Sequence, residues 1–365
     1  MLKKKIALGL AAALVLTSAV GCSGGEKTEP AKEETKPAEQ TEAAKEEAPA
    51  AEKALKVGMV TDVGGVNDES FNQSAWEGLV RAKDDLGIEV NYIESKQDAD
   101  YQTNLETMID SENDLIWGIG YKMGDALLDS AKQNPDQKYA IIDYSYGDST
   151  PENIVGVVFH QEQCSFLVGY IAGKMTETNK VGFVGGMTGA LIEQFEAGYK
   201  AGVKYANPNA EIASQYAESF SDAAKGKAIA QKMYNDGADI VFHAAGNVGS
   251  GVIEAANEMG KWAIGVDRDQ NYLAPDHVLT SAMKLVGSGT YNITKDLMDG
   301  KWAGGTTVDY GVAEQGVGIA PTSPNHVPAE ILEKVTNIES KIASGEIVVP
   351  LTNEEAEAFD ATDAE

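Results

Sequence analysis

The sequence is poor in cysteine and histidine. It has two cysteines in 365 residues, and Cys22 directly follows an apolar leader, so Cys164 is left alone and no structural disulfide is expected. The four histidines are scattered, and none stands at a spacing that would join a nucleophile to a base. We therefore predict that the protein is not an enzyme, and that Cys164 is a small buried apolar residue.

Basic residues are also scarce. The chain has 29 lysines and arginines against 57 aspartates and glutamates, for a formal net charge of -28. Such a surface repels nucleic acid, so no nucleic-acid partner is expected. No Gly-Lys-Ser or Gly-Lys-Thr element for phosphate occurs. Asp62, Asn67 and Asp68 lack the alternate-residue ligand pattern of a calcium loop, so we predict no metal and no cofactor.

The amino terminus has the pattern of an export signal. Three lysines at 3–5 precede an apolar run at 6–20, and small residues lead into Cys22. This pattern predicts a signal peptide at 1–21. A cysteine at the first mature position resembles a bacterial lipobox, which implies a diacylglycerol and palmitate anchor on Cys22 at the extracytoplasmic face of the cell membrane. An ordinary secreted chain is the alternative.

Residues 22–54 are almost free of large apolar side chains. Glu, Lys, Ala, Pro and Thr dominate the segment, and it contains no aromatic residue. Because such a composition buries too little apolar surface to offset the entropy of ordering, we predict a disordered linker. The linker would let a globular domain stand away from the membrane while it remains tethered to it.

The rest of the chain alternates strand-like and helix-like segments in two series. Alternation of this kind predicts an α/β fold with two lobes, each a doubly wound parallel sheet. The predicted strands of the first series are 56–61, 88–94, 114–119, 139–144 and 154–159, and those of the second are 180–185, 211–216, 238–244 and 261–266. A further strand at 278–284 and a helix at 286–299 follow, and this helix has no counterpart within its series.

The two series are similar in detail, because the fourth strand of each ends in an aspartate, Asp143 or Asp267. The carboxyl ends of parallel strands form the binding edge of a sheet, so both carboxylates should face one cleft between the lobes. We expect three crossings, near 159–163, 280–286 and 303–312, that act as a hinge. The predicted first lobe comprises 55–160 and 285–306, the second comprises 161–284 and 307–350, and an acidic tail follows at 351–365.

Several segments then identify a family. The matching segments are DVGGVNDESFNQSAWEG at 62–78, FEAGYKAGV at 195–203, AAGNVGSGV at 244–252, IGVDRDQ at 264–270 and TSAMK at 280–284. They resemble the basic membrane protein (BMP) family of ABC transporter substrate-binding lipoproteins. The resemblance implies a type 1 periplasmic-binding-protein fold and a monomeric receptor that delivers a purine nucleoside to the permease of an ABC importer.

A nucleoside offers a flat base and a hydroxyl-bearing ribose, and the cleft contains side chains suited to both. Phe71 and Phe242 are predicted to stack on the base, and Asp143 to accept from an N–H on its edge. Asp267, Lys284 and Asn72 would hold the ribose hydroxyls. The remaining predicted contacts are Asp62, in the turn before Phe71, and Gly246, beside the start of a helix.

Other interpretations remain open for these residues. Both phenylalanines could pack in the core, the two aspartates could cap helices, and Gly246 could serve a tight turn. At the level of function, the alternatives are a sugar or autoinducer receptor on the same fold, and a surface sensor or adhesion lipoprotein.

Overall fold

The computed structural model describes residues 54–360. The predictions for the signal peptide, for Cys22 and for nearly all of the linker lie outside the described residues, as do the last five residues of the tail. Within the described part, no helix has the length and apolar character needed to cross a membrane.

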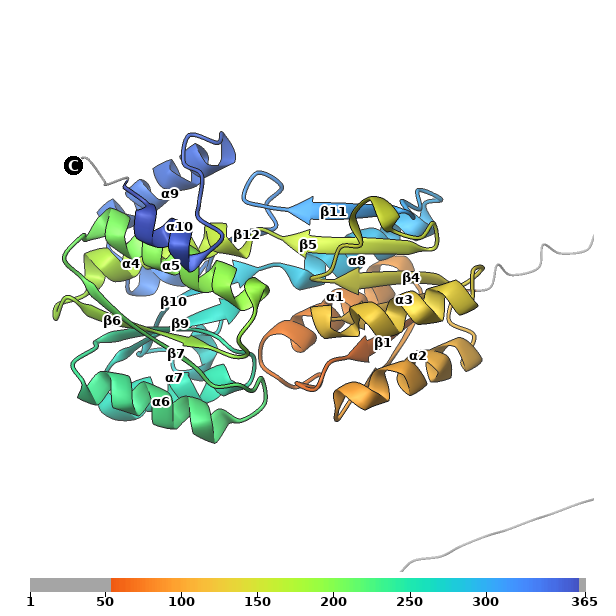
Figure 1. Ribbon diagram of the computed structural model, residues 1–365, viewed down its shortest axis with the longest axis horizontal. Coiled ribbons are helices and arrows are strands. Elements are labelled where there is room, and N and C mark those ends of the chain that lie inside the picture. Colours follow the sequence, from red (N-terminus) through yellow and green to blue (C-terminus); the bar gives the residue numbers. More distant parts are fainter. Residues whose placement is uncertain (1–53, 361–365) are drawn as a thin grey trace, which may run out of the picture. The chain divides into compact units, whose positions relative to one another are not determined.

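Two six-stranded sheets, one in each lobe, form the framework (Figure 1). The first sheet has the order β11-β5-β4-β3-β1-β2, and all of its pairings are parallel. Its strands are β1 (Lys56–Thr61), β2 (Glu89–Glu94), β3 (Leu115–Ile119), β4 (Lys138–Ile142), β5 (Ile154–Phe159) and β11 (Thr306–Tyr310). Its helices are α1 (Phe71–Leu86), α2 (Tyr101–Asp110), α3 (Gly124–Gln133) and α8 (Val286–Met298).

The second sheet has the order β12-β10-β9-β8-β6-β7 and is parallel except where β12 pairs with β10. Its strands are β6 (Lys180–Gly185), β7 (Glu211–Tyr216), β8 (Ile240–Ala244), β9 (Trp262–Asp267), β10 (Val278–Lys284) and β12 (Val317–Ile319). Its helices are α4 (Gln161–Met175), α5 (Ala190–Ala206), α6 (Ala223–Asn235), α7 (Val248–Met259) and α9 (Ala329–Ala343). The α/β prediction is confirmed.

Burial explains why the central strands are so apolar. All five residues of β3 are buried, as are all five of β8, because helices cover both faces of each sheet. Side chains of α2 and α3 pack on one face of the first sheet, and those of α1 and α8 pack on the other. The edge strands β2 and β7 are half-exposed and correspondingly polar.

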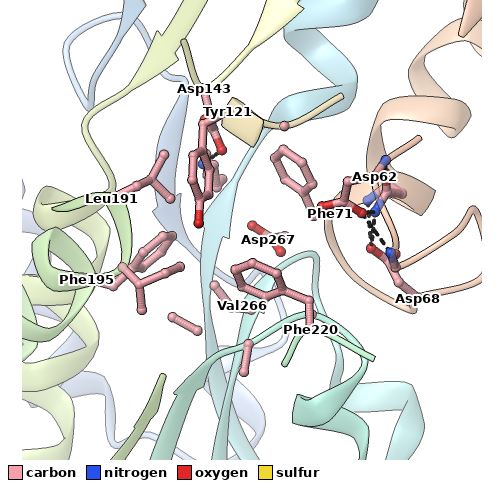
Figure 2. A pocket seen from close by; sticks show the side chains of 18 residues that line it. Asp62, Asp68, Phe71, Tyr121, Asp143, Leu191, Phe195, Phe220, Val266 and Asp267 are labelled. Atoms are coloured by element: carbon pink, nitrogen blue, oxygen red, sulfur yellow. Dashed lines mark hydrogen bonds and ion pairs between the residues drawn. The ribbon is translucent and has the colours of Figure 1, made fainter. Parts of the chain in front are cut away.

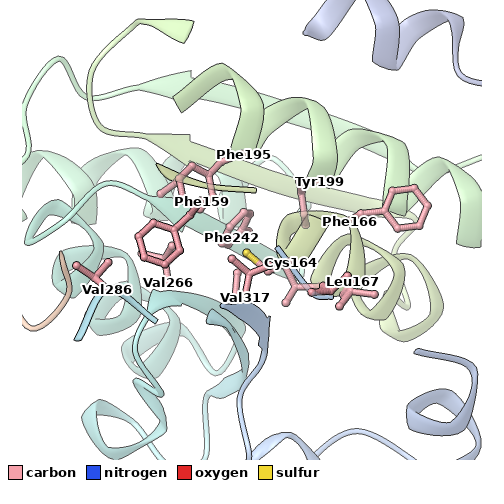
Figure 3. Packing of buried hydrophobic residues seen from close by; sticks show 14 of the residues in the cluster. Phe159, Cys164, Phe166, Leu167, Phe195, Tyr199, Phe242, Val266, Val286 and Val317 are labelled. Atoms are coloured by element: carbon pink, nitrogen blue, oxygen red, sulfur yellow. The ribbon is translucent and has the colours of Figure 1, made fainter. Parts of the chain in front are cut away.

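Cys164 is fully buried in α4, and its thiol donates to the carbonyl of Gln161 at 3.2 Å. It lies in an apolar cluster with Phe166, Tyr199 and Phe242 (Figure 3). Burial raises the pKa of the Cys164 thiol above its usual range, so the thiolate is disfavoured. The structure thus places Cys164 in the core, as the sequence predicted.

The chain crosses between the lobes three times, after β5, after β10 and after β11. The predicted lobe boundary at 306 needs correction, because β11 pairs with β5 and extends the first lobe to Tyr310. This strand lies at the edge of its sheet and is partly exposed, so it lacks the buried apolar run that would have revealed it. The predicted acidic tail also contains a short helix, α10 (Asn353–Ala358), which packs on α5.

Helix α8 returns to the first lobe and packs on α1. Two glycines permit a close approach, because a Cβ added at Gly78 would lie 2.1 Å from the carbonyl oxygen of Gly287. The hydroxyl of Thr290 donates to the carbonyl of Ala75 at 3.0 Å across the same contact. Helix α8, which follows the second crossing, is therefore fixed against the helix that begins beside the cleft.

Substituting Gly78→Ala tests this contact. Helix propensity alone would stabilise α1 by up to about 1 kcal/mol. The clash with Gly287 should instead lower the free energy of unfolding by about 1–3 kcal/mol. Urea unfolding measures the change, and Asp84→Ala on the exposed side of the same helix is the control. Unchanged or increased stability of Gly78→Ala would contradict the packing.

Candidate functional site

A cavity lies where the carboxyl ends of the two sheets face each other. About 540 Å³ of space free of protein atoms lies among its lining residues, and part of this space is open to solvent. The first lobe contributes Asp62, Gly64, Asp68, Phe71, Asn72, Gly120, Tyr121 and Asp143. The second lobe contributes Leu191, Ile192, Phe195, Phe220, Ala244, Ala245, Gly246, Val266, Asp267 and Lys284. Figure 2 shows these residues around one space.

The loop between β1 and α1 is held by its own polar side chains. The carboxylate of Asp68 accepts from the backbone N–H of Ser70, Asn72 and Gln73 and so caps α1. The amide nitrogen of Asn72 donates to Asp62 at 2.7 Å and to Asp68 at 2.9 Å. Burial raises the pKa of Asp62 to about 6, although its hydrogen bonds from Gly64 and Asn72 oppose the shift.

Asp143 and Lys284 form a buried ion pair between the lobes. Asp143 follows β4 and Lys284 ends β10, and the ammonium nitrogen lies 2.6 Å from Asp143 Oδ2. The side chains are 4% and 1% exposed, respectively, so neither charge is solvated by bulk water. Three rings, those of Phe71, Phe159 and Phe195, lie 5.2–5.6 Å from the ammonium group. The cation is thus held by one carboxylate and by aromatic faces.

The second carboxylate oxygen of Asp143, Oδ1, does not take part in the ion pair. Asp143 Oδ1 is buried and has no hydrogen-bond partner among residues 54–360. Burial raises the pKa of Asp143, while the Lys284 ammonium opposes that shift. A buried carboxylate oxygen without a donor is costly, so this atom marks a place where a hydrogen-bond donor is missing from the protein itself.

Asp267 is the corresponding residue of the second lobe. Its carboxylate accepts from the hydroxyl of Ser70, which belongs to the first lobe. Burial raises the pKa of Asp267 to about 7, although Lys284 and the Ser70 hydrogen bond oppose the rise. Asp143 and Asp267 share a left-handed backbone, with φ of 65° and 63°. Their side chains make contacts between the lobes rather than capping helices, so the capping interpretation does not describe them.

The structure brings seven of the eight predicted site residues to the cavity, and Phe242 is the exception. Phe242 is fully buried in the middle of β8 and packs against Phe183 and Tyr199, with ring centroids at 5.6 and 5.2 Å (Figure 3). The prediction that Phe242 lines the cleft is therefore wrong. The residues of the same segment that do line it are at the strand end, from Ala244 to Gly246, where Gly246 has φ of 56° in a tight turn.

Other aromatic residues take the place of Phe242. In Figure 2 the Asp267 carboxylate lies between the rings of Phe71 and Phe220, while Phe195 borders the cavity from α5. Tyr121 and Phe220 follow β3 and β7, so the rule that located Asp143 at a strand end could also have located them. Leu191, Ile192 and Phe195 could not be found this way, because they lie on a helix whose orientation depends on packing.

The two lobes contribute different kinds of side chain to the cavity. Three of its four carboxylates come from the first lobe, whereas the apolar side chains come mainly from the second. Within the described residues, no group of three or more histidine, cysteine or carboxylate side chains is placed to hold a metal ion. The site is suited to a partly aromatic organic molecule with several hydrogen-bond donors.

Comparison with known proteins gives consistent matches. The sequence profile of ABC transporter substrate-binding proteins described as PnrA-like matches residues 55–353. The chain is 44% identical over 319 residues to the CD4+ T-cell-stimulating antigen of Listeria innocua, covering 82% of this chain and 88% of that protein. It is 43% identical over 308 residues to basic membrane protein A of Borreliella burgdorferi, covering 83% and 90%.

Among solved structures, a solute-binding protein of an ABC transporter system from Aeropyrum pernix matches with a TM-score of 0.76 and 26% identity, over 83% of this chain and 96% of that one. The resemblance to the basic membrane proteins and the predicted fold are thereby confirmed. The matching family and this solved structure are described as substrate-binding and solute-binding proteins, which agrees with the prediction that the chain is not an enzyme. The chain belongs to the Bmp family of PnrA-like ABC transporter substrate-binding proteins.

Proposed function

We propose that this substrate-binding protein is a monomeric receptor for purine nucleosides, anchored through a lipid on Cys22 at the extracytoplasmic face of the cell membrane. It binds the nucleoside in the cavity between its lobes and delivers it to the permease of an ABC importer. The signal-like leader and Cys22 support the anchor, and the family supports the importer.

The unpartnered oxygen of Asp143 is the main support for a base in the cavity. The oxygen is buried, Asp143 is one of the residues that line the cavity, and the Lys284 ammonium contacts only the other oxygen of the same carboxylate. A purine base carries N–H donors on a rigid edge, and such a donor would satisfy Oδ1 with a charge-assisted hydrogen bond. A sugar without a base could offer only hydroxyl donors to Oδ1, and only the C–H faces of its ring to the aromatic side chains.

The rest of the cavity suits the other parts of a nucleoside. Phe71, Phe195, Phe220 and Tyr121 provide aromatic surface on both lobes, and stacking on such surfaces contributes about 1–3 kcal/mol per base. Asp62 and Asp267 can accept from ribose hydroxyls, which need acceptors in a site with little water. Four carboxylates against a single lysine disfavour a phosphate group.

Titration calorimetry of the mature protein tests the proposal. Adenosine, guanosine, inosine, uridine, ribose and the purine nucleoside 5′-monophosphates form the panel. At least one purine nucleoside should bind with measurable heat, ribose should give none, and each monophosphate should bind more than about tenfold more weakly than its nucleoside. Heat from ribose with none from any nucleoside would instead favour a sugar receptor.

Substitution of two phenylalanines distinguishes a residue that lines the cavity from one that packs in the core. Phe71→Leu removes a ring that borders the cavity, so affinity for the bound nucleoside should fall roughly tenfold or more while stability changes little. Phe242→Leu alters a buried ring outside the cavity and should cost roughly 1 kcal/mol of stability with affinity kept within about twofold. Calorimetry and urea unfolding measure both effects. A loss of affinity in Phe242→Leu equal to that in Phe71→Leu would contradict the assignment.

Affinity should depend on pH through Asp267 and Asp62, whose pKa values burial raises to about 7 and about 6. Ribose hydroxyls donate more strongly to ionised carboxylates, so affinity should rise between about pH 5 and about pH 8. Asp267→Asn should weaken binding and reduce this rise above pH about 6. An identical pH profile in the wild type and in Asp267→Asn would exclude Asp267 as the titrating acceptor.

The raised pKa of Asp267 should also make the free energy of unfolding of the ligand-free protein fall as pH rises. The folded pKa of Asp267 lies above the 3.8 of an unperturbed aspartate, so its stabilising contribution is complete below pH 3.8 and is lost as pH rises through about 7. Relative to Asp267→Asn, the free energy of unfolding of the wild type should fall by roughly 1–3 kcal/mol from about pH 4 to about pH 8. Urea unfolding at both pH values measures the difference, with Asp84→Asn as an exposed control.

A further inference from the structure

One carboxylate of the second lobe, that of Glu196 on α5, joins three segments of the chain. Its side chain is 4% exposed, and its Oε1 lies 2.6 Å from the ammonium nitrogen of Lys200, one turn further along α5. Its Oε2 accepts from the hydroxyl of Tyr216 at 2.6 Å and from the side-chain amide of Asn353 at 3.1 Å. Tyr216 ends β7 and Asn353 begins α10, so the carboxylate connects α5 to both. Glu196, Tyr216 and Asn353 are called the Glu196 cluster below.

The carboxylate of Glu196 is stabilised in its charged form. Burial would raise its pKa, but hydrogen bonds that include those from Lys200, Tyr216 and Asn353 outweigh burial and hold the pKa below its usual range. Hydrogen bonds to an ionised acceptor are roughly twice as strong as those between neutral groups. The Glu196 cluster therefore holds its segments more firmly than an exposed ion pair would.

Asn353 contacts α5 at three positions. Its backbone N–H donates to the carboxylate of Glu193 at 3.1 Å, its amide nitrogen donates to Glu196, and its amide oxygen accepts from Lys200 at 2.9 Å. Positions 193, 196 and 200 are three and four residues apart, so they lie on one side of the helix. A capping box fixes the first turn of α10 itself. The C-terminal helix thus holds the amino-terminal part of α5, on which it packs (Figure 1).

The same part of α5 carries one wall of the cavity. Leu191, Ile192 and Phe195 line the cavity from α5, and Phe220 lines it from the segment after β7. Among the described residues, Val266 is the one other large apolar side chain that the second lobe contributes. Figure 2 shows Leu191, Phe195 and Phe220 bordering one space. The two segments that the carboxylate joins are therefore the two that supply most of the apolar wall.

The ring of Tyr216 also links these segments by packing. A Cβ added at Gly185 would lie 2.6 Å from this ring and 3.1 Å from the side chain of Ile192, so the ring covers the end of β6 beside a cavity residue. The ring of Phe220 covers Gly186 in the same way, at 2.3 Å from an added Cβ. Because Tyr216 and Phe220 are four residues apart, the hydroxyl bond to α5 also limits where Phe220 can lie.

We propose that the Glu196 cluster positions the apolar wall of the cavity, so that Glu196, Tyr216 and Asn353 are positioning residues for ligand binding although none of them lines the cavity. Binding side chains must be held within about 0.5 Å of their productive place by the residues behind them, and the cluster gives this support to Phe195 and Phe220. All of its contacts lie within the second lobe, so the inference does not depend on how the lobes are arranged. It rests on the proposed function for the identity of the ligand.

The first measurement needs no ligand. Amide hydrogen exchange of the mature protein, followed by mass spectrometry, reports local opening of α5 and of the segment 217–222. Tyr216→Phe and Asn353→Ala should each speed exchange in these segments by roughly three- to tenfold and leave α1 unchanged. The control is Tyr234→Phe, which removes a hydroxyl of α6 that donates to the carbonyl of Trp262 at 2.9 Å. It should leave exchange in α5 unchanged.

Binding is the second measurement. With the purine nucleoside that gives the largest heat, Tyr216→Phe and Asn353→Ala should bind roughly three- to tenfold more weakly, whereas Tyr234→Phe should stay within about twofold of the parent. In a chain that carries Phe220→Leu, adding Tyr216→Phe should lower affinity by about twofold or less, because its effect acts through that ring. Glu196→Gln retains an acceptor oxygen and should bind more tightly than Glu196→Leu, which has none.

Unchanged exchange of α5 in both Tyr216→Phe and Asn353→Ala would overturn the proposal. Faster exchange with the affinity of the parent would do the same, as would an equal loss of affinity from Tyr216→Phe with and without Phe220→Leu. Failure of every nucleoside to bind the parent would instead count against the proposed function, and exchange would still decide whether the cluster holds α5. If Glu196→Leu does not fold, Tyr216→Phe and Asn353→Ala carry the test.

Discussion

The buried ion pair between Lys284 and Asp143 is the interaction on which the site depends. Lys284 is the last residue of β10, immediately before the chain crosses to α8, and Asp143 follows β4 in the other lobe. Neither charge could stay in this apolar setting alone, because an unpaired buried charge is strongly destabilising. The pair therefore requires the lobes to be close together, and the same closeness brings Phe71, Phe195 and Asp267 around one cavity.

Asp143 and Asp267 have the same backbone conformation in the two lobes, but their side chains make different contacts. Asp143 follows β4 and Asp267 is the last residue of the corresponding strand β9, and both have a left-handed backbone. Asp143 then pairs with a cation and leaves one oxygen without a donor, whereas Asp267 accepts from a hydroxyl of the opposite lobe. Three of the four carboxylates that line the cavity come from the first lobe and most of the apolar side chains come from the second, which suits a ligand with a hydrogen-bonding part and a flat part.

Sequence patterns predicted most of the framework, because parallel strands buried on both faces leave apolar runs that are easy to recognise. Asp143, Asp267 and the loop before α1 were found because strand ends in such sheets lie at the binding edge. Phe242 was assigned wrongly, since position along a strand, and not residue type, decides whether a side chain reaches that edge. Strand β11 was missed because it is exposed at its sheet edge, and Phe195 was missed because helix orientation is set by tertiary packing.

In the proposed function, Asp143 Oδ1 accepts a hydrogen bond from the base of a bound nucleoside. The most direct measurement is a crystal structure of the mature protein with the purine nucleoside that it binds most tightly. The account predicts that a base N–H lies within about 3.2 Å of Oδ1, with the base against the rings of Phe71 and Phe220. A nucleoside bound outside this cavity, or one that turns only its ribose toward Asp143, would contradict it.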